Sequence, residues 1–136
     1  MKLISAVVAT FALSLSLLVS GTATAAPAVY PGSVTTTCGF IVPRVDGPHR
    51  LRVRMHVTAG NATPTGHVTL RLRKRTASGH YRLVRNPTLA YAGGTLKYKF
   101  RHLKRGRYKV KYFYTPPTNS VFKSCASVTR RARVTG

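Results

Sequence analysis

Negative charge is almost absent from this sequence. Its 136 residues include one acidic residue, Asp46, against 23 lysines and arginines, and the formal net charge is +22. Chemistry by paired carboxylates needs a second acidic side chain and is therefore excluded. A Ser-His-Asp arrangement would depend on Asp46, which lies in an Asp-Gly turn pattern without a nucleophile-elbow motif. We expect no catalytic residues, no small-molecule substrate and a protein that is not an enzyme.

Metal-ligand patterns are missing as well, and the chain has no tryptophan. The five histidines are scattered without ligand spacing, and cations close to them would oppose the binding of a metal ion. We interpret the histidines as exposed residues that add positive charge below neutral pH. The sequence predicts no metal site and no cofactor.

Long apolar runs are also scarce, because only one is present, from Leu3 to Val19. It follows a basic start at Lys2 and precedes a small-residue segment, which is the layout of a secretory signal peptide. We predict a signal peptide over residues 1–25, a flexible lead-in over 26–33 and one domain over 34–136. An uncleaved membrane anchor is the alternative, for which the run is short. The mature chain should be secreted, or associated with the cell envelope from outside.

Cysteine occurs only twice, as Cys38 near the start of the predicted domain and Cys125 near its end. In an oxidising compartment such a pair predicts a disulfide. Two free thiols or a metal-binding pair are the alternative, but no C-x-x-C pattern accompanies either cysteine. Because like charges at this density repel one another, a covalent bridge would help to hold the compact state.

The positive charge does not make the chain disordered, since 43% of its residues are hydrophobic and disorder requires low hydrophobicity. The clearest pattern lies in residues 95–115, which read TLKYKFRHLKRGRYKVKYFYT. Successive side chains of a strand point to opposite faces, so this alternation predicts two strands with cations outside. The inward phase consists of Leu96, Tyr98, Phe100, Tyr108, Val110, Tyr112 and Tyr114.

The same alternation recurs at residues 51–57 and 67–75, and shorter strand candidates lie at 35–42, 81–85, 89–92 and 126–134. No stretch shows a helical period. About seven short strands separated by turn signals predict an all-β, antiparallel β-sandwich. We expect Pro43 to end the first strand and Tyr81 and Leu83 to share a face. In the last run Val128 falls in the apolar phase, but Arg130 interrupts it, so we expect a bulge near Cys125.

Several motifs occur in the order and spacing of a known family. They are PTGHVTL at residues 64–70, GTL at 94–96, the pattern Leu103-x-x-Gly106-x-Tyr108-x-Val110-x-Tyr112, and Phe122. Over most of residues 50–130 the chain resembles the immunoglobulin-like repeat domains of bacterial surface and secreted proteins, here in a single copy.

This resemblance implies an immunoglobulin-like sandwich with a corner built from Leu103, Gly106 and Tyr108. The ring of Tyr108 would lie in the core and its hydroxyl would bond back to the preceding turn. The chain departs from the antibody pattern, because its cysteines fall on the first and last strands. In the immunoglobulin topology those strands are usually sheet neighbours, which makes a bridge reasonable.

The outward-facing residues of the predicted strands indicate the function. Same-face cations on neighbouring strands would form grids with spacing comparable to the phosphates of a polyanion. We predict one grid on each sheet: Arg52, Arg54, Lys97, Lys99 and Arg101 on the first, and Arg71, Arg73, Lys109 and Lys111 on the second.

With one acid in the chain, almost no cation can find an intramolecular partner, and such a surface attracts polyanions without specific contacts. We therefore expect a monomeric, non-enzymatic protein that binds anionic polymers, whether cell-wall polymer, nucleic acid or an anionic lipid surface. A cationic effector that disturbs anionic membranes is one alternative. A structural module without a ligand is another.

Overall fold

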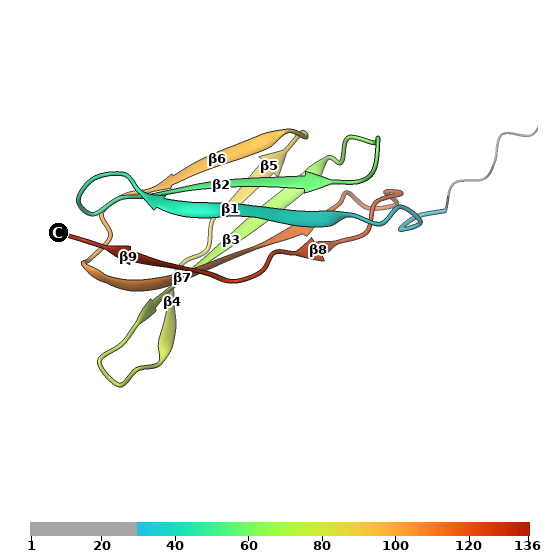
Figure 1. Ribbon diagram of the computed structural model, residues 1–136. Helices are drawn as coiled ribbons and strands as arrows, with labels where there is room; N and C mark the ends of the chain where they lie inside the picture. The colour runs from blue at the N-terminus through green and yellow to red at the C-terminus, as the bar shows by residue number, and fades with distance from the viewer. Residues whose placement is uncertain (1–29) are drawn as a thin grey trace, which may run out of the picture.

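The computed structural model describes residues 30–136. The predicted signal peptide, 1–25, lies outside the described residues, as do residues 26–29 of the predicted lead-in. Over the described residues the chain forms nine β-strands and no helix (Figure 1). The strands are β1 (Thr37–Val45), β2 (Leu51–Thr58), β3 (Gly66–Arg75), β4 (Tyr81–Arg85), β5 (Thr88–Tyr91), β6 (Thr95–Phe100), β7 (Gly106–Thr115), β8 (Cys125–Ala126) and β9 (Arg130–Val134).

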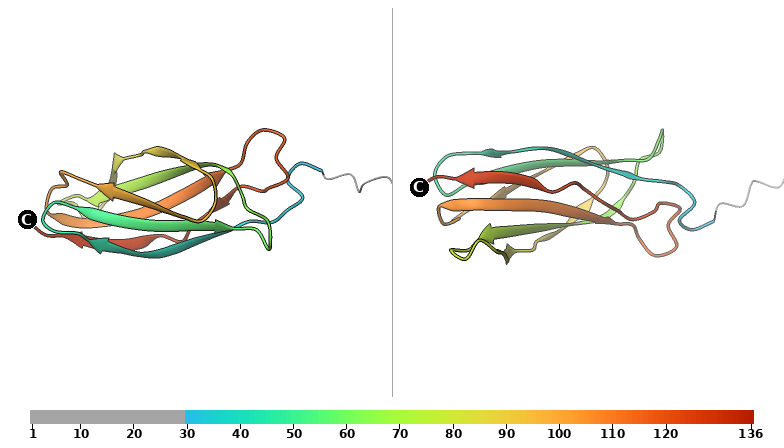
Figure 2. Two further views of the ribbon diagram at one scale, coloured as in Figure 1. Left: turned by 90° about the horizontal axis from the view of Figure 1, so that it is seen from above. Right: turned by 60° about the horizontal axis from the view of Figure 1, so that its bottom comes forward.

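The strands form two sheets that lie one over the other (Figure 1). One sheet has the order β1-β2-β6, and the other has β4-β3-β7-β8 with β5 also pairing with β3 and β9 with β7. All these strand pairs are antiparallel. This confirms the predicted antiparallel β-sandwich, and the strand order is that of immunoglobulin-like folds. The C-terminus lies at one end of the sandwich, and the chain enters at the other (Figure 2).

The core lies between the sheets and is built by the predicted apolar phases. In β2, for example, Leu51, Val53 and Met55 are completely buried, and in β7 Tyr108, Val110, Tyr112 and Tyr114 are buried. Full burial of one large apolar side chain contributes about 1.5–3 kcal/mol. Leu96 and Tyr98 of β6 are half-buried against this cluster, so the inward phase predicted for residues 95–115 is confirmed.

The predicted corner is present at the turn between β6 and β7. Leu103 is buried, and its backbone N–H donates to the carbonyl of His49 at 3.0 Å. Gly106 has a φ of +153°, which side chains disfavour. The hydroxyl of Tyr108 donates to the carbonyl of Lys104, in the turn that precedes it. These contacts fix the path by which the chain enters β7.

A disulfide joins Cys38 of β1 to Cys125 of β8, with their Cα atoms 5.7 Å apart. The pairing predicted from the sequence is confirmed. The expectation that these strands are neighbours in one sheet is wrong, because β1 and β8 belong to different sheets. The bridge therefore joins the two layers and closes a chain segment with a sequence separation of 87 residues.

Pro43 does not end the first strand as expected. β1 continues to Val45, and its pairing with β2 shifts register between Ile41 and Arg44, which places Pro43 inside an irregularity. β1 is an edge strand, and proline is tolerated at edges and bulges because no ladder hydrogen bond is lost there. The proline therefore marks a bulge and not a strand end.

Tyr81 and Leu83 share a face of β4 as expected, because they lie opposite Arg75 and Arg73 of β3, and this face is the outer one. Leu83 is 46% exposed, whereas Val84 packs against the core. The β3–β4 pairing shifts register between Leu72 and Arg73, so the two strands do not keep a simple alternation. This shift cannot be read from β4 alone.

The irregularity expected near Cys125 is present and divides the last run into β8 and β9. Phe113 pairs with Ala126, but Val110 pairs with Arg130, so the register on β7 shifts by one residue. The buried Ser127 lies in between, and its Oγ accepts a hydrogen bond from the backbone N–H of Tyr112 at 3.0 Å. Val128, expected in the apolar phase, is 60% exposed as a result.

Candidate anion-binding surface

The outer side of the three-stranded sheet carries the first predicted grid. Arg52 lies opposite Lys99 and Arg54 lies opposite Lys97, because β2 and β6 pair in that register. We call these four residues the β2–β6 face. Arg101, predicted to belong to the same grid, is exposed just beyond the end of β6.

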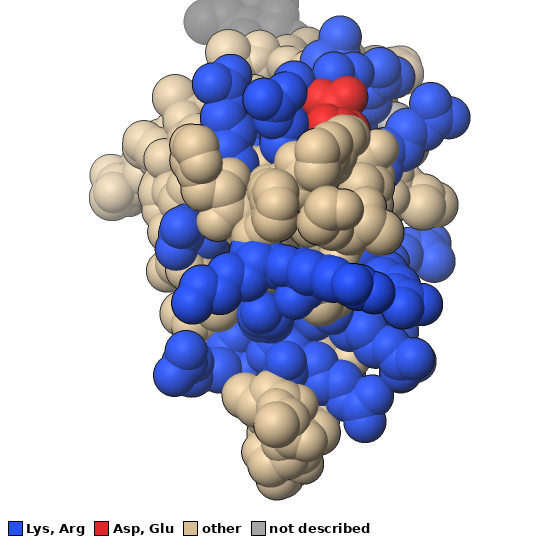
Figure 3. All heavy atoms as spheres, turned by 90° about the vertical axis from the view of Figure 1, so that its left-hand side faces the viewer, with Lys and Arg blue, Asp and Glu red and all other residues tan. Residues whose placement is uncertain are grey.

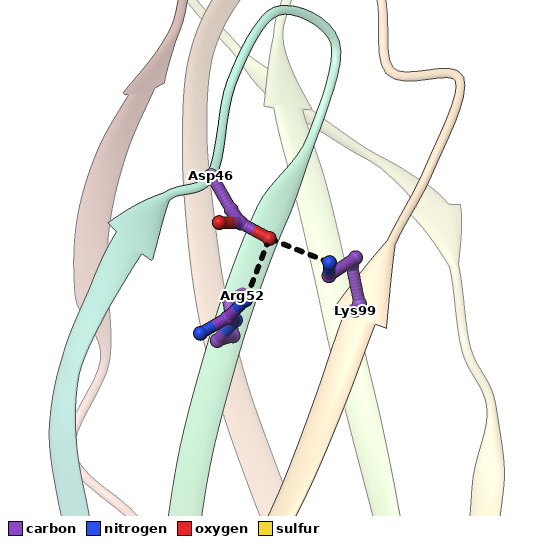
Figure 4. A network of polar contacts seen from close by, with 3 residues as sticks. All are labelled: Asp46, Arg52 and Lys99. Atoms are coloured by element: carbon purple, nitrogen blue, oxygen red, sulfur yellow. Dashed lines mark hydrogen bonds and ion pairs between the residues drawn. The ribbon is translucent and has the colours of Figure 1, made fainter.

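The single acidic residue neutralises part of this face. One carboxylate oxygen of Asp46, Oδ2, accepts from Arg52 Nη2 at 2.9 Å and from Lys99 Nζ at 2.6 Å (Figure 4). The hydrogen bond from Lys99, with further attraction from Arg52, holds the pKa of Asp46 below its ordinary value despite some desolvation. Two of the predicted polyanion-binding residues are therefore already engaged by an internal anion.

The outer side of the larger sheet brings together the second predicted grid. Arg71 lies opposite Lys111, and Arg73 lies opposite Lys109. On its other side Lys109 faces Arg131 of β9, and Arg107 faces Arg133. We call Arg71, Arg73, Lys109, Lys111 and Arg131 the β3–β7–β9 face. Its cations come from three adjacent strands, and no ion pair within residues 30–136 involves any of them.

This face is hollowed. All five of its cations line one depression of about 420 Å³, together with Tyr81, Phe113 and Thr129. Lys109 Nζ lies 4.0 Å from the centre of the Tyr81 ring. The guanidinium of Arg71 lies 4.4 Å from the centre of the Phe113 ring, and Lys111 Nζ lies 5.1 Å from it. Three of the five cations are thus in contact with an aromatic ring.

Figure 3 views the end of the sandwich that carries the C-terminus. Lysines and arginines cover a broad, continuous area in the lower half of this view, where the larger sheet lies. The acidic residue lies in the upper part of this view, next to cations of the other layer. The positive charge is therefore least compensated over the larger sheet.

Sequence reasoning missed four groups at this site, namely Arg131, Thr129 and the rings of Tyr81 and Phe113. The signal for Phe113 was present, because it continues the outward phase of Lys109 and Lys111. The outward position of Arg131 could not be predicted, because the last run is interrupted between β8 and β9 and Arg130 therefore looked like the irregular residue. The pattern placed Tyr81 on one face with Leu83, but its contact with Lys109 depends on how β4 pairs with β3.

Within residues 30–136, no three histidine, cysteine, aspartate or glutamate side chains gather where they could hold a metal ion. The same residues contain no helix with the length and apolar character needed to cross a membrane. A comparison with known protein families finds no match, and a comparison with curated proteins finds none either. The chemistry of the surface is therefore the basis for a functional proposal.

Proposed function

We propose that this protein binds anionic polymers of the cell envelope or extracellular matrix electrostatically, through the β3–β7–β9 face and without catalysis. The observation that carries the proposal is the hollow lined by five cations on three strands, none of them paired with an acid among the described residues. A soluble surface without a ligand normally mixes both signs of charge. Here the fold brings positive charges together without acidic side chains to balance them.

The two faces differ in a way that favours the larger sheet as the contact surface. On the β2–β6 face a polyanion would compete with Asp46 for Arg52 and Lys99. On the β3–β7–β9 face it would meet no internal competitor among the described residues. Neutralising phosphates with lysine and arginine releases condensed counterions, which drives association at low salt.

Sequence-specific reading of nucleic acid does not fit this surface. The major groove admits a helix or a two-stranded ribbon, whereas these cations extend from the outer side of a sheet of several strands, and residues 30–136 contain no helix. Contacts of lysine and arginine with a phosphate backbone position a polymer but carry no sequence information. Binding should therefore depend on charge density and depend little on nucleotide sequence.

Polymer binding is favoured over membrane disruption by the distribution of apolar residues. The large apolar side chains exposed in the described region come from four separate segments, namely the lead-in, β1, β4 and the connection between β8 and β9: Tyr30, Val42, Val45, Leu83 and Val128. A protein that inserts into a lipid surface needs a contiguous apolar face. The membrane-active effector is therefore the less supported alternative.

We further propose that the chain is exported and related to bacterial immunoglobulin-like repeat domains. The disulfide between Cys38 and Cys125 supports an oxidising compartment. The strand order and the hydroxyl contact of Tyr108 support the relationship. A single module of this kind would act through its own surface.

The test is a binding titration of the mature protein against duplex DNA, polyphosphate and a neutral polysaccharide at several salt concentrations. For B-DNA, the logarithm of the association constant should fall linearly with the logarithm of salt, with a slope of about −0.9 per phosphate contacted. Several contacts are expected, so binding should be tight in dilute buffer and weak well above physiological salt. An interaction insensitive to salt, or a preference for the neutral polymer, would reject the proposal. Dye leakage from anionic vesicles would indicate the membrane-active alternative.

A further inference from the structure

The hollow on the β3–β7–β9 face contains contacts between cations and aromatic rings, which a general attraction between charges does not require. We infer that it is a discrete site for a short run of adjacent phosphate groups, in which Tyr81 and Phe113 hold the binding cations in place. The inference rests on the proposed function and narrows it, since it assigns both the place of contact and the chemical group. It predicts that phosphate is preferred to carboxylate at equal charge.

The register of the strands arranges the cations in two rows. Arg73, Lys109 and Arg131 lie side by side across β3, β7 and β9, and Arg71 with Lys111 forms the next row. Neighbouring strands are about 4.8 Å apart, and same-face residues of one strand are about 6.6–7 Å apart. Donors therefore reach the hollow from several sides, at separations that suit successive groups of a linear polymer.

Phosphate matches this arrangement better than carboxylate does. A phosphate group has oxygens in a tetrahedral arrangement, so it can accept hydrogen bonds from several separate side chains at once. A carboxylate offers two oxygens in one plane, which a single arginine can satisfy. Thr129 also lines the hollow, and its hydroxyl adds a neutral donor for a further oxygen.

The two rings hold cationic side chains of the hollow in position before a ligand binds. Five clustered cations repel one another, and long side chains lose conformational freedom when a ligand fixes them. The face of an aromatic ring attracts a cation, and the rings of Tyr81 and Phe113 hold Lys109, Arg71 and Lys111 at 4.0, 4.4 and 5.1 Å. Non-specific attraction would need the charges alone, so the rings indicate a preorganised site.

Calorimetric titration with tripolyphosphate tests the inference on the intact mature protein. We expect one tripolyphosphate to bind to each protein molecule. Its affinity should be at least about tenfold higher than that of butanetetracarboxylate at the same ionic strength, because one additional well-formed charged hydrogen bond contributes about that much. Phe113→Leu and Tyr81→Leu leave the net charge unchanged, and each should weaken tripolyphosphate binding by about 2- to 5-fold. Tyr81→Phe keeps the ring and should retain most of the affinity.

A matched pair of charge variants shows where the site lies. Arg73→Gln and Arg54→Gln each remove one exposed cation from within a strand, on the β3–β7–β9 face and the β2–β6 face respectively. Arg73→Gln should weaken tripolyphosphate binding about tenfold, the cost of one charged hydrogen bond. Arg54→Gln should change it little. Thermal melting of each variant verifies that it is folded.

The outcomes separate this inference from the proposed function. Equal affinity for tripolyphosphate and the tetracarboxylate would overturn the inference. So would ring variants that bind like wild type, or equal losses in Arg73→Gln and Arg54→Gln. In each of these cases a steep salt dependence of polymer binding would leave the proposed function standing. Absence of polymer binding in dilute buffer would overturn both.

Discussion

The hydroxyl of Tyr108 donates a hydrogen bond to the backbone carbonyl of Lys104, four residues earlier in the chain. The ring is buried between the sheets with 2% of its surface exposed, and burial raises the pKa of the phenol. The contact spans Gly106, whose φ of +153° allows the tight entry into β7. One side chain thus joins the core to the turn that precedes β7, the central strand of the β3–β7–β9 face.

Removing this hydroxyl should be much less costly than removing the ring. Tyr108→Phe loses one hydrogen bond and should lower the free energy of unfolding by about 1 kcal/mol. Tyr108→Ala also leaves a cavity and should lower it by about 3–5 kcal/mol. Denaturant unfolding of both variants measures the difference. Equal and negligible losses would contradict the burial of this ring.

The sequence predicted the core well because alternation in a strand is a local property. The inward phases of β2, β3 and β7 follow from neighbouring residues alone, and Leu51, Val68 and Val110 are buried as expected. The errors occur where pairing between strands shifts register, as at Pro43 and Val128. A register shift depends on the partner strand, which lies far away in the sequence, so the local pattern does not contain it.

The disulfide between Cys38 and Cys125 should matter most when the charges are unscreened. It closes a segment with a sequence separation of 87 residues, and chain entropy then predicts a stabilisation of up to about 4–5 kcal/mol. The double variant Cys38→Ser/Cys125→Ser should have a markedly lower melting temperature. The loss should be larger in dilute buffer than in high salt, because salt screens the repulsion that the bridge opposes.

Melting curves of the double variant and the wild type at two salt concentrations measure this effect, with high salt as the internal control. An equal loss of melting temperature at both concentrations would mean that the bridge does not act against charge repulsion. Two free thiols in the protein purified under oxidising conditions would show that the bridge does not form.

Asp46 should stabilise the fold only while it is ionised. Its pKa is lowered in the folded state by the hydrogen bond from Lys99, so the unfolded state binds the proton more tightly. The contribution is therefore present above the unfolded pKa, about 3.9, and is lost as pH falls through the lower folded pKa. Asp46→Asn should melt at a lower temperature than wild type near neutral pH.

The same comparison in acid should give a smaller difference, which should disappear as the pH falls below the lowered folded pKa of Asp46 and both states become protonated. Added salt at neutral pH should also reduce the difference, because the carboxylate is partly exposed. A difference that persists in acid would instead indicate that Asp46 acts through the shape of its turn. The ion pairs with Arg52 and Lys99 would then contribute little.

The candidate site was predictable in part. Both grids of cations follow from the outward phases, and β-sheet pairing does bring Arg71 beside Lys111 and Arg73 beside Lys109. The sequence could not show that Asp46 reaches across β2 to Lys99 of β6, since that contact depends on sheet order. It could not rank the two faces for the same reason.

The two faces should contribute unequally to the binding of DNA. The triple variant Arg71→Gln/Arg73→Gln/Lys109→Gln should reduce the magnitude of the salt slope for B-DNA by up to about 2.7, at about 0.9 for each phosphate that is no longer neutralised. The matched control Arg54→Gln/Lys97→Gln/Arg101→Gln removes the same charge while leaving the partners of Asp46 intact. The slope of this control should stay close to that of wild type, because the β3–β7–β9 face would still neutralise the same phosphates and release the same counterions. Equal reductions in both variants would mean that neither face is preferred. A larger reduction in the control would place the contact on the β2–β6 face, with Asp46 unable to shield it.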